Sequence, residues 1–315
     1  MTGAAERPPG ERRAVVARVD FRSCLLLPAE GDPLEATVRG RLLGRTKTLG
    51  NALVVGDMAR YDVEDGRAVV TGAEPRRNHF SRRAPGDPAR EQVVAASLDQ
   101  VVLVTSIVEP DFRPGFADRV LCQAEHAGLP ARLVVNKVDL DDRGETRAVL
   151  EDYARAGYAG RAVSAKTGEG VEHLRRACRG RRSLFVGHSG VGKSTLLNAL
   201  VPGLDLLVGR VNSKTGKGRH ITTAAWLIRP EPEFELIDTP GMRTFALWGV
   251  GPRDLEQAYT EFRRFLGECR FANCRHDREP GCAIKAAVDV GEISSLRHDS
   301  FLKLLGELEP ETAGA

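Results

Sequence analysis

Residues 183–195 read SLFVGHSGVGKST, an apolar run followed by a glycine-rich turn and the start of a helical pattern. The segment 187–194 fits the phosphate-loop pattern G-x-x-x-x-G-K-[ST], and its position between a strand and a helix is the context that this pattern requires. Glycines let backbone N–H groups surround a phosphate, and the helix N-terminus adds positive potential. The nucleotide-binding residues predicted here are Gly187, His188, Ser189, Gly190, Val191, Gly192, Lys193, Ser194 and Thr195.

Two side chains of this loop have predicted chemical roles. Lys193 is expected to reach the β- and γ-phosphates and is assigned a catalytic role, and the Ser194 hydroxyl is expected to ligate Mg²⁺. Farther along, the apolar run FELI ends in the turn DTPG, where Asp238 can hold Mg²⁺ through water and the Gly241 N–H can sense a γ-phosphate. After a phosphate loop, this turn indicates the second switch of a GTPase.

Residues 216–223, GKGRHITT, lie between these two motifs and form a polar stretch that precedes a strand. Such a stretch suits a first switch loop, whose threonine closes on Mg²⁺ when the γ-phosphate is present.

A predicted base site precedes the phosphate loop. Asn136, Lys137, Val138 and Asp139 follow the apolar run RLVV, and Ser164, Ala165 and Lys166 follow the next strand. The Asp139 carboxylate can accept hydrogen bonds from N1–H and the 2-amino group of guanine, whereas adenine would leave that carboxylate unpaired. Lys137 is expected to pack over the base, and Asn136 to brace the phosphate loop. Together the two motifs predict guanine specificity.

The order of these motifs is unusual, because both base motifs come before the phosphate loop instead of after it. Strand–helix units are self-contained, so a chain can be cut at an exposed loop and rejoined at its nearby ends. We therefore predict a circularly permuted GTPase. In this order the second switch near Gly241 leads directly into the C-terminal part of the chain, so movement at the γ-phosphate should pull on it.

The regions on either side of these motifs differ from them in predicted secondary structure. Five short β-rich runs between residues 13 and 70 predict a small barrel of the OB type, although their spacing equally allows a sandwich. Residues 75–92 are predicted to form a linker or a loop whose arginines contact phosphate. Strands alternate with helices from residue 98, which predicts a parallel, doubly wound sheet. The predicted domains are a tail plus barrel at 1–84, a GTPase domain at 85–250 and a mainly helical zinc-binding domain at 251–315.

Composition limits the class of protein. The chain has 315 residues, of which 42% are hydrophobic and 28% charged, and its net charge is +3. The longest apolar stretch, 101–108, is too short to cross a bilayer, and the N-terminus lacks the apolar core of a signal peptide. We expect a cytoplasmic protein without a membrane partner. The positive excess in the first 85 residues is weak evidence for an RNA-binding front end.

Three cysteines and a histidine cluster near the C-terminus as C-x₄-C-x-H-x₅-C. Three thiolates and one imidazole match a closed, tetrahedral structural zinc site, which leaves no open position for catalysis. The remaining cysteines are expected to be core filler or inert thiols. His79, His126, His173 and His298 are expected to be ordinary surface or helix residues. The predicted ligands of one zinc ion per chain are Cys269, Cys274, His276 and Cys282.

These features resemble the RsgA (YjeQ) family of bacterial GTPases. The resemblance covers nearly the whole chain, and it consists of the β-rich front end, the order NKVDL, SAKTG, GHSGVGKST, GRHITT and DTPG, and the cysteine cluster followed by PGCAIKAAV. It implies a late assembly factor that binds the small ribosomal subunit and its rRNA, hydrolyses GTP to GDP when docked, and checks or releases the maturing particle. A monomer is expected.

Two positions bear on the reaction. Met242 follows DTPG where many GTPases carry a glutamine that positions water, so the free protein should hydrolyse GTP slowly. The resemblance implies that His220 of the first switch takes that catalytic role. Ile221 stands where relatives usually carry threonine, which makes Thr222 the assigned Mg²⁺ ligand and catalytic-site residue, with Thr223 as the alternative.

Overall fold

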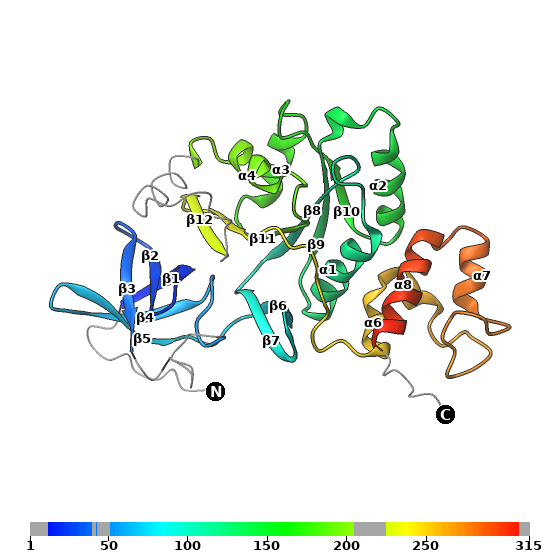
Figure 1. The fold of residues 1–315 in the computed structure, drawn as a ribbon, viewed down its shortest axis with the longest axis horizontal. Coiled ribbons are helices and arrows are strands. Elements are labelled where there is room, and N and C mark those ends of the chain that lie inside the picture. The colour runs from blue at the N-terminus through cyan, green and yellow to red at the C-terminus, as the bar shows by residue number, and fades with distance from the viewer. Residues whose placement is uncertain (1–11, 40–41, 43–50, 205–224, 309–315) are drawn as a thin grey trace.

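A computed structural model describes residues 12–39, 42, 51–204 and 225–308. The molecule is elongated, with a β-barrel at one end, an α/β domain in the middle and a helical unit at the other end (Figure 1). None of the helices in the described ranges combines the length and apolar character that a membrane-spanning helix needs.

The N-terminal strands close into a barrel, as predicted, and the sandwich is excluded. Its strand order is β1-β2-β3-β5-β4, and β1 pairs with β4 to complete the ring. Alternate side chains such as Val16, Leu26 and Val70 are fully buried inside it, because successive residues of a strand face opposite sides. The strands are β1 (Arg12–Val19), β2 (Ser23–Pro28), β3 (Leu34–Val38), β4 (Met58–Glu64) and β5 (Arg67–Ala73).

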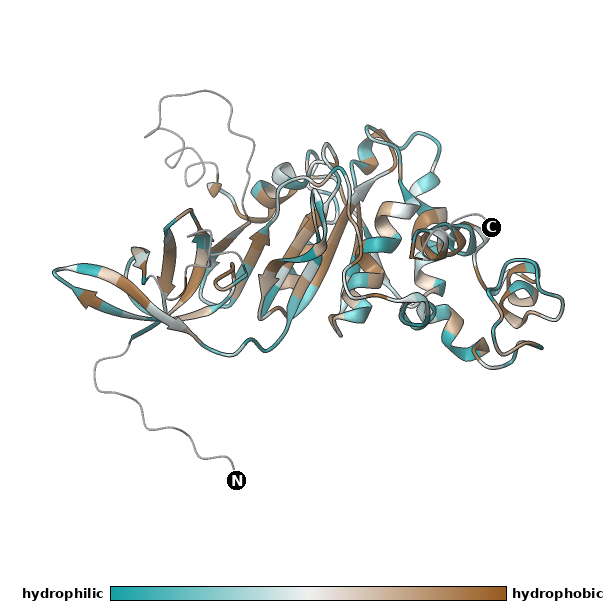
Figure 2. Ribbon diagram, turned by 60° about the horizontal axis from the view of Figure 1, so that its bottom comes forward, coloured by the Kyte–Doolittle hydropathy of each residue, from teal (hydrophilic) through white to brown (hydrophobic). Residues whose placement is uncertain are grey.

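The central domain is a six-stranded sheet in the order β10-β9-β8-β11-β13-β12. Every residue of its central strand β8 is buried, and hydrophobic residues dominate the middle of the sheet (Figure 2). In this sheet β10, β9, β8, β11 and β13 are parallel, as predicted. The edge strand β12 instead runs antiparallel to β13, because only a short turn joins the two strands. The strands are β8 (Gln100–Ser106), β9 (Ala131–Asn136), β10 (Ala159–Ala162), β11 (Arg181–Gly187), β12 (Trp226–Glu231) and β13 (Phe234–Asp238).

Helices cover both faces of this sheet. On one face Val101 and Leu103 share a core with α1 (Pro114–His126) and α2 (Glu145–Arg155). On the other face Val102 and Val104 share a core with α3 (Val171–Cys178) and α4 (Lys193–Leu200). The alternation along β8 therefore feeds two separate cores, which is the doubly wound arrangement that the sequence predicted.

The linker or loop predicted over residues 75–92 is wrong in one respect, because much of it forms a hairpin. Strands β6 (His79–Ala84) and β7 (Asp87–Ala96) pair antiparallel around the turn at Pro85 and Gly86, where Gly86 adopts a φ of +75°. Pro85 lies in the turn, and Pro88 lies in the irregular stretch of β7 between Asp87 and Glu91, so neither proline breaks a regular pairing. Phe80 anchors the hairpin by packing 5.6 Å from the ring of Phe245.

The C-terminal unit is helical and packs on α1. It consists of α6 (Pro252–Ala258), a 3₁₀ turn η3 (Thr260–Phe265), α7 (Ala283–Asp289) and α8 (Ser295–Leu308). Its centre is Arg297 of α8, which is only 1% exposed. The guanidinium donates two hydrogen bonds to the Glu261 carboxylate, at 2.7 and 3.0 Å, and a third to Asp118 of α1.

Aromatic rings close over this buried cation. The Tyr259 ring centroid lies 4.5 Å from the Arg297 guanidinium carbon, and the Tyr153 hydroxyl donates to Asp118 at 2.8 Å. Two buried carboxylates and one buried guanidinium thus join the central domain to the C-terminal unit. Breaking such a group by removing one member is costly, because the remaining charges stay buried without a partner.

Arg297→Met should therefore lower the free energy of unfolding by about 3 kcal/mol or more, since it strands the carboxylates of Asp118 and Glu261. Urea unfolding followed by tryptophan fluorescence measures this change, because Trp248 exchanges hydrogen bonds with Gln123 of α1. As a control, Arg147→Met removes an exposed ion pair on α2 and should leave the unfolding curve unchanged. Identical curves for the wild type and Arg297→Met would contradict the assigned role of the buried group.

Candidate functional site

The glycine-rich loop between β11 and α4 surrounds a pocket of about 350 Å³. Two close approaches explain its glycines: a Cβ on Gly192 would lie 2.6 Å from the Asn136 Nδ2, and one on Gly187 would lie 2.6 Å from the Val104 carbonyl oxygen. Val191 points instead into the core and is 2% exposed. The pocket is lined by His188, Ser189, Gly190, Gly192, Lys193, Ser194, Thr195, Asp238, Thr239, Pro240 and Gly241.

Lys193 is nearly buried at the bottom of this pocket, with 6% of its surface exposed. Its ammonium group contacts the Asp238 carboxylate and the Thr239 carbonyl oxygen at the end of β13. The carboxyl end of β13 thus holds the ammonium group of Lys193 in the pocket. A phosphate that enters the pocket offers the ammonium group a stronger acceptor than the carbonyl oxygen.

The segment after β13 lies directly against the glycine-rich loop. The Met242 N–H donates to the Gly187 carbonyl at 3.1 Å. A Cβ on Gly241 would lie 3.0 Å from the Ser189 Cα, so the two backbones touch and a larger residue would push them apart. Gly241 therefore lines the pocket beside Ser189 of the glycine-rich loop.

Asn136 joins three predicted motifs through hydrogen bonds. Its Nδ2 donates to the Val191 carbonyl at 2.9 Å, and its Oδ1 accepts from the Ala165 N–H at 3.1 Å. The Ser164 hydroxyl donates to the Asp139 carboxylate at 2.6 Å. One amide therefore ties the base motif at 136–139 to the segment 164–166 and to the glycine-rich loop.

The remaining base-site residues lie around this amide. Lys137 adopts a left-handed φ of 64°, and its ammonium group contacts the Glu109 carbonyl oxygen, a partner with no sequence signal. Val138 is half-buried and Lys166 is exposed. The predicted switch residues His220, Thr222 and Thr223 lie outside the described residues.

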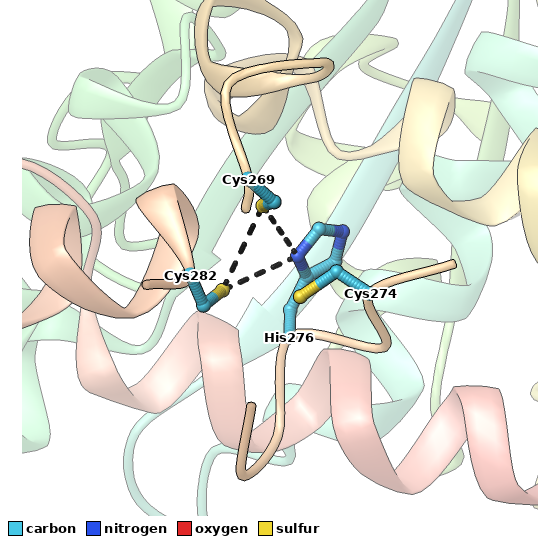
Figure 3. A group of neighbouring side chains, drawn as sticks. All are labelled: Cys269, Cys274, His276 and Cys282. Carbon is cyan, nitrogen blue, oxygen red and sulfur yellow. Dashed lines mark hydrogen bonds between the residues drawn. The ribbon is translucent and has the colours of Figure 1, made fainter. Parts of the chain in front are cut away.

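The four predicted metal ligands meet in the C-terminal unit (Figure 3), with their ligand atoms all within 4.8 Å of one another. The His276 Nδ1 lies 3.6 Å from the Cys269 Sγ and 3.4 Å from the Cys282 Sγ, and the two sulfurs are 3.9 Å apart. Tetrahedral zinc with ordinary bond lengths separates two sulfurs by about 3.8 Å and a nitrogen from a sulfur by about 3.5 Å. The donor set therefore fits a closed zinc site.

Burial sets the protonation of this cluster when no metal is bound. Burial raises the pKa of the Cys274 thiol to about 12, so the thiol retains its proton unless a cation replaces it. Burial likewise lowers the pKa of His276, which keeps that imidazole neutral and able to act as a ligand.

Two side chains behind the cluster were not singled out by sequence. His298 was expected to be an ordinary residue, but it is buried, and its Nε2 lies 2.7 Å from the His276 carbonyl oxygen. Glu256 of α6 lies 3.7 Å from the His276 Nε2, on the side away from the sulfurs. Groups in such positions orient metal ligands, and only the tertiary packing of α6 and α8 reveals them.

Comparison with known proteins identifies the family. The family model for the RsgA GTPase matches residues 73–248. The chain is 42% identical over 283 residues to the protein of Gemmatimonas aurantiaca named small ribosomal subunit biogenesis GTPase RsgA, covering 89% of this chain and 92% of that one. This chain belongs to the RsgA GTPase family. An RsgA protein of Chlorobaculum parvum is also 42% identical, over 268 residues that cover 82% of this chain and 86% of that one.

Solved structures agree with this family. YjeQ from Thermotoga maritima superimposes with a TM-score of 0.73 at 30% identity and covers 95% of this chain and 98% of its own. YloQ, described as a circularly permuted GTPase, has the same fold with a TM-score of 0.70 at 24% identity, covering 98% and 99% of the two chains. The predicted permuted fold is confirmed, and this member of the RsgA family is a GTPase, a hydrolase.

Guanine selectivity should depend on Asp139. Asp139→Asn should weaken GTP binding by at least about tenfold and admit xanthosine triphosphate, because the amide presents a donor where guanine needs an acceptor. Titration with fluorescent nucleotides measures both effects. Asp142→Asn makes the same change on an exposed carboxylate outside the motif and should alter neither affinity. Unchanged GTP preference in Asp139→Asn would show that the base binds elsewhere.

Zinc should stabilise the C-terminal unit. Metal analysis of the wild type should return about one equivalent of zinc per chain, and less than about half would contradict the site. Cys274→Ser should lose the metal and increase protease cleavage between residues 266 and 290, while GTP binding largely survives. Cys178→Ala removes a thiol from the central domain and should retain the zinc.

Proposed function

We propose that this protein is a late-stage assembly factor of the small ribosomal subunit, and that the bound subunit stimulates its hydrolysis of GTP to GDP and phosphate. The proposal rests on relatives that cover most of this chain and are named small ribosomal subunit biogenesis GTPases. The observation that carries the site assignment is the convergence of Asn136, Lys193 and Asp238 on one edge of the sheet.

In the proposed site the base meets Asp139 and the backbone after Ser164, while Lys137 packs over it. The phosphates are cradled by the N–H groups of residues 188–195, and Lys193 exchanges its contact with Thr239 for a phosphate oxygen. Ser194 and Thr222 would hold Mg²⁺, with Asp238 acting through water. Magnesium bound there would neutralise charge on the phosphates.

The free protein should be a slow enzyme for a structural reason. The Met242 side chain is 6% exposed and packs in the core that contains α1, so it offers the attacking water no polar group. Without a group that orients water, the barrier to hydrolysis stays high. We assign that role to His220 in the first switch segment, once docking on the subunit brings His220 to the γ-phosphate.

The elongated shape suits a large RNA partner. The barrel and the zinc-binding unit lie at opposite ends of the molecule, on either side of the GTPase domain (Figure 1). We propose that both ends contact the small subunit and its rRNA, so that docking spans the nucleotide site. The protein then acts as a monomer in the cytoplasm, with GTP and GDP as its other ligands and no membrane partner.

GTP turnover should rise about 10³-fold when purified small subunits are added at saturation, because docking supplies the missing control of water. His220→Ala should retain GTP binding and subunit docking but lose most of that stimulation. His173→Ala, which removes an exposed imidazole near β10, should behave as the wild type.

The two failures have different meanings. Equal stimulation of His220→Ala and the wild type would remove His220 from the mechanism. No stimulation of either protein would favour a second function, a nucleotide-dependent RNA-binding module in which hydrolysis is incidental, as the apolar Met242 would allow.

A further inference from the structure

An arginine outside every predicted motif stands beside the phosphate pocket. Arg113 is the residue that precedes α1, and its Nη1 lies 2.9 Å from the Nε2 of His188, which lines the pocket. We propose that Arg113 is a phosphate-facing cation of the GTPase site, which His188 positions beside the γ-phosphate. This inference rests on the nucleotide site proposed above and adds a residue to it.

The chemistry of the contact fixes the state of the imidazole. A guanidinium group only donates hydrogen bonds, so the His188 Nε2 must be the unprotonated acceptor. The proton of the neutral ring is then on Nδ1, which donates to the Ser189 carbonyl at 2.9 Å. The Phe116 ring packs edge-on against the imidazole, with centroids 5.7 Å apart. His188 is thus held between α1 and the glycine-rich loop, and it holds Arg113 in turn.

The contact lies at the end of the pocket where a γ-phosphate is expected. His188 forms a parallel β-bridge with Met242, next to Gly241. Its neighbour Ser189 touches Gly241, since a Cβ there would be 3.0 Å from the Ser189 Cα. The base motif reaches the glycine-rich loop at its other end, through Val191. Arg113 therefore stands nearer the terminal phosphate than the base.

The charge balance of the site favours a second cation beside Lys193. Among the described residues, no carboxylate lies within ion-pair distance of Arg113, whereas Lys193 is already paired with Asp238. A triphosphate carries more negative charge than one magnesium ion and one lysine neutralise. An anionic phosphate oxygen is a stronger acceptor than a neutral imidazole, and the planar guanidinium can bind two oxygens at once. Arg113 is exposed, so its remaining donors are open to solvent.

This placement predicts a difference between nucleotides. Because the added charge of GTP lies on the γ-phosphate, Arg113→Ala should weaken a non-hydrolysable GTP analogue by about tenfold and GDP by less than about twofold. The affinity of Arg113→Lys for the GTP analogue should fall between those of the wild type and Arg113→Ala, since lysine keeps the charge but cannot bind two phosphate oxygens at once as the planar guanidinium can. Binding is measured by titrating each full-length variant with fluorescent forms of both nucleotides in excess Mg²⁺.

The chain offers a matched control. Arg161 is another exposed arginine of the same domain whose Nη2 contacts a histidine Nε2, that of His173, at 2.7 Å. Unlike His188, His173 does not line the pocket. Arg161→Ala should bind both nucleotides as the wild type does. His188→Ala should weaken binding of the GTP analogue selectively. In the His188→Ala background, the further change Arg113→Ala should reduce affinity for the analogue by less than it does in the wild type, because the residue that positions Arg113 is already gone.

Each outcome decides the proposal. Wild-type affinity of Arg113→Ala for both nucleotides overturns it, and so do equal losses of GTP analogue and GDP, which would indicate a structural role. Lys193→Ala separates this failure from failure of the site itself. If Lys193→Ala still binds both nucleotides normally, the phosphates lie elsewhere and both proposals fall. If it loses them while Arg113→Ala does not, only the assignment of Arg113 is wrong.

Discussion

Parallel pairing of β9, β8, β11 and β13 is the constraint from which the nucleotide site follows. Parallel strands present their carboxyl ends at one edge of the sheet, so the loops after Asn136, Gly187 and Asp238 must meet there. Their order along the chain does not matter to this geometry. The permutation therefore leaves the site intact, and changes only which segments are covalently joined to it.

Helix α1 connects the phosphate pocket to the C-terminal unit. Its N-terminal end carries Arg113 beside the phosphate pocket, and one turn later Phe116 packs against both His188 and Phe245. Two residues beyond Phe116, Asp118 is bound by the buried Arg297 of the C-terminal unit. Since segment 239–251 also leaves the pocket toward α6, two routes join the phosphate pocket to the C-terminal unit. One is covalent, and the other is a rigid helix held by buried charges.

Sequence predicted what short motifs and periodic patterns encode. The glycine-rich loop, the base motif, the cysteine spacing and the alternating strands each carry a local signal, and these sufficed for the family and fold. The antiparallel β12 and the hairpin at 79–96 are pairings across short turns that the apolar pattern did not mark, whereas the partners of Arg297 depend on contacts between distant segments. His298 and Glu256 were missed for the same reason, since nothing near them in sequence marks the ligand that they face.

The site separates binding from reaction. Its binding groups are fixed before any nucleotide arrives: Asn136 braces the loop, and Lys193 is held in the pocket by Asp238. The position that controls water in many GTPases is instead taken by Met242, whose side chain belongs to the hydrophobic core. Replacing it with a polar group would disturb that core, and for this reason our proposal takes the group that controls water from another segment. On that proposal, the rate of hydrolysis depends on whatever brings this segment into place.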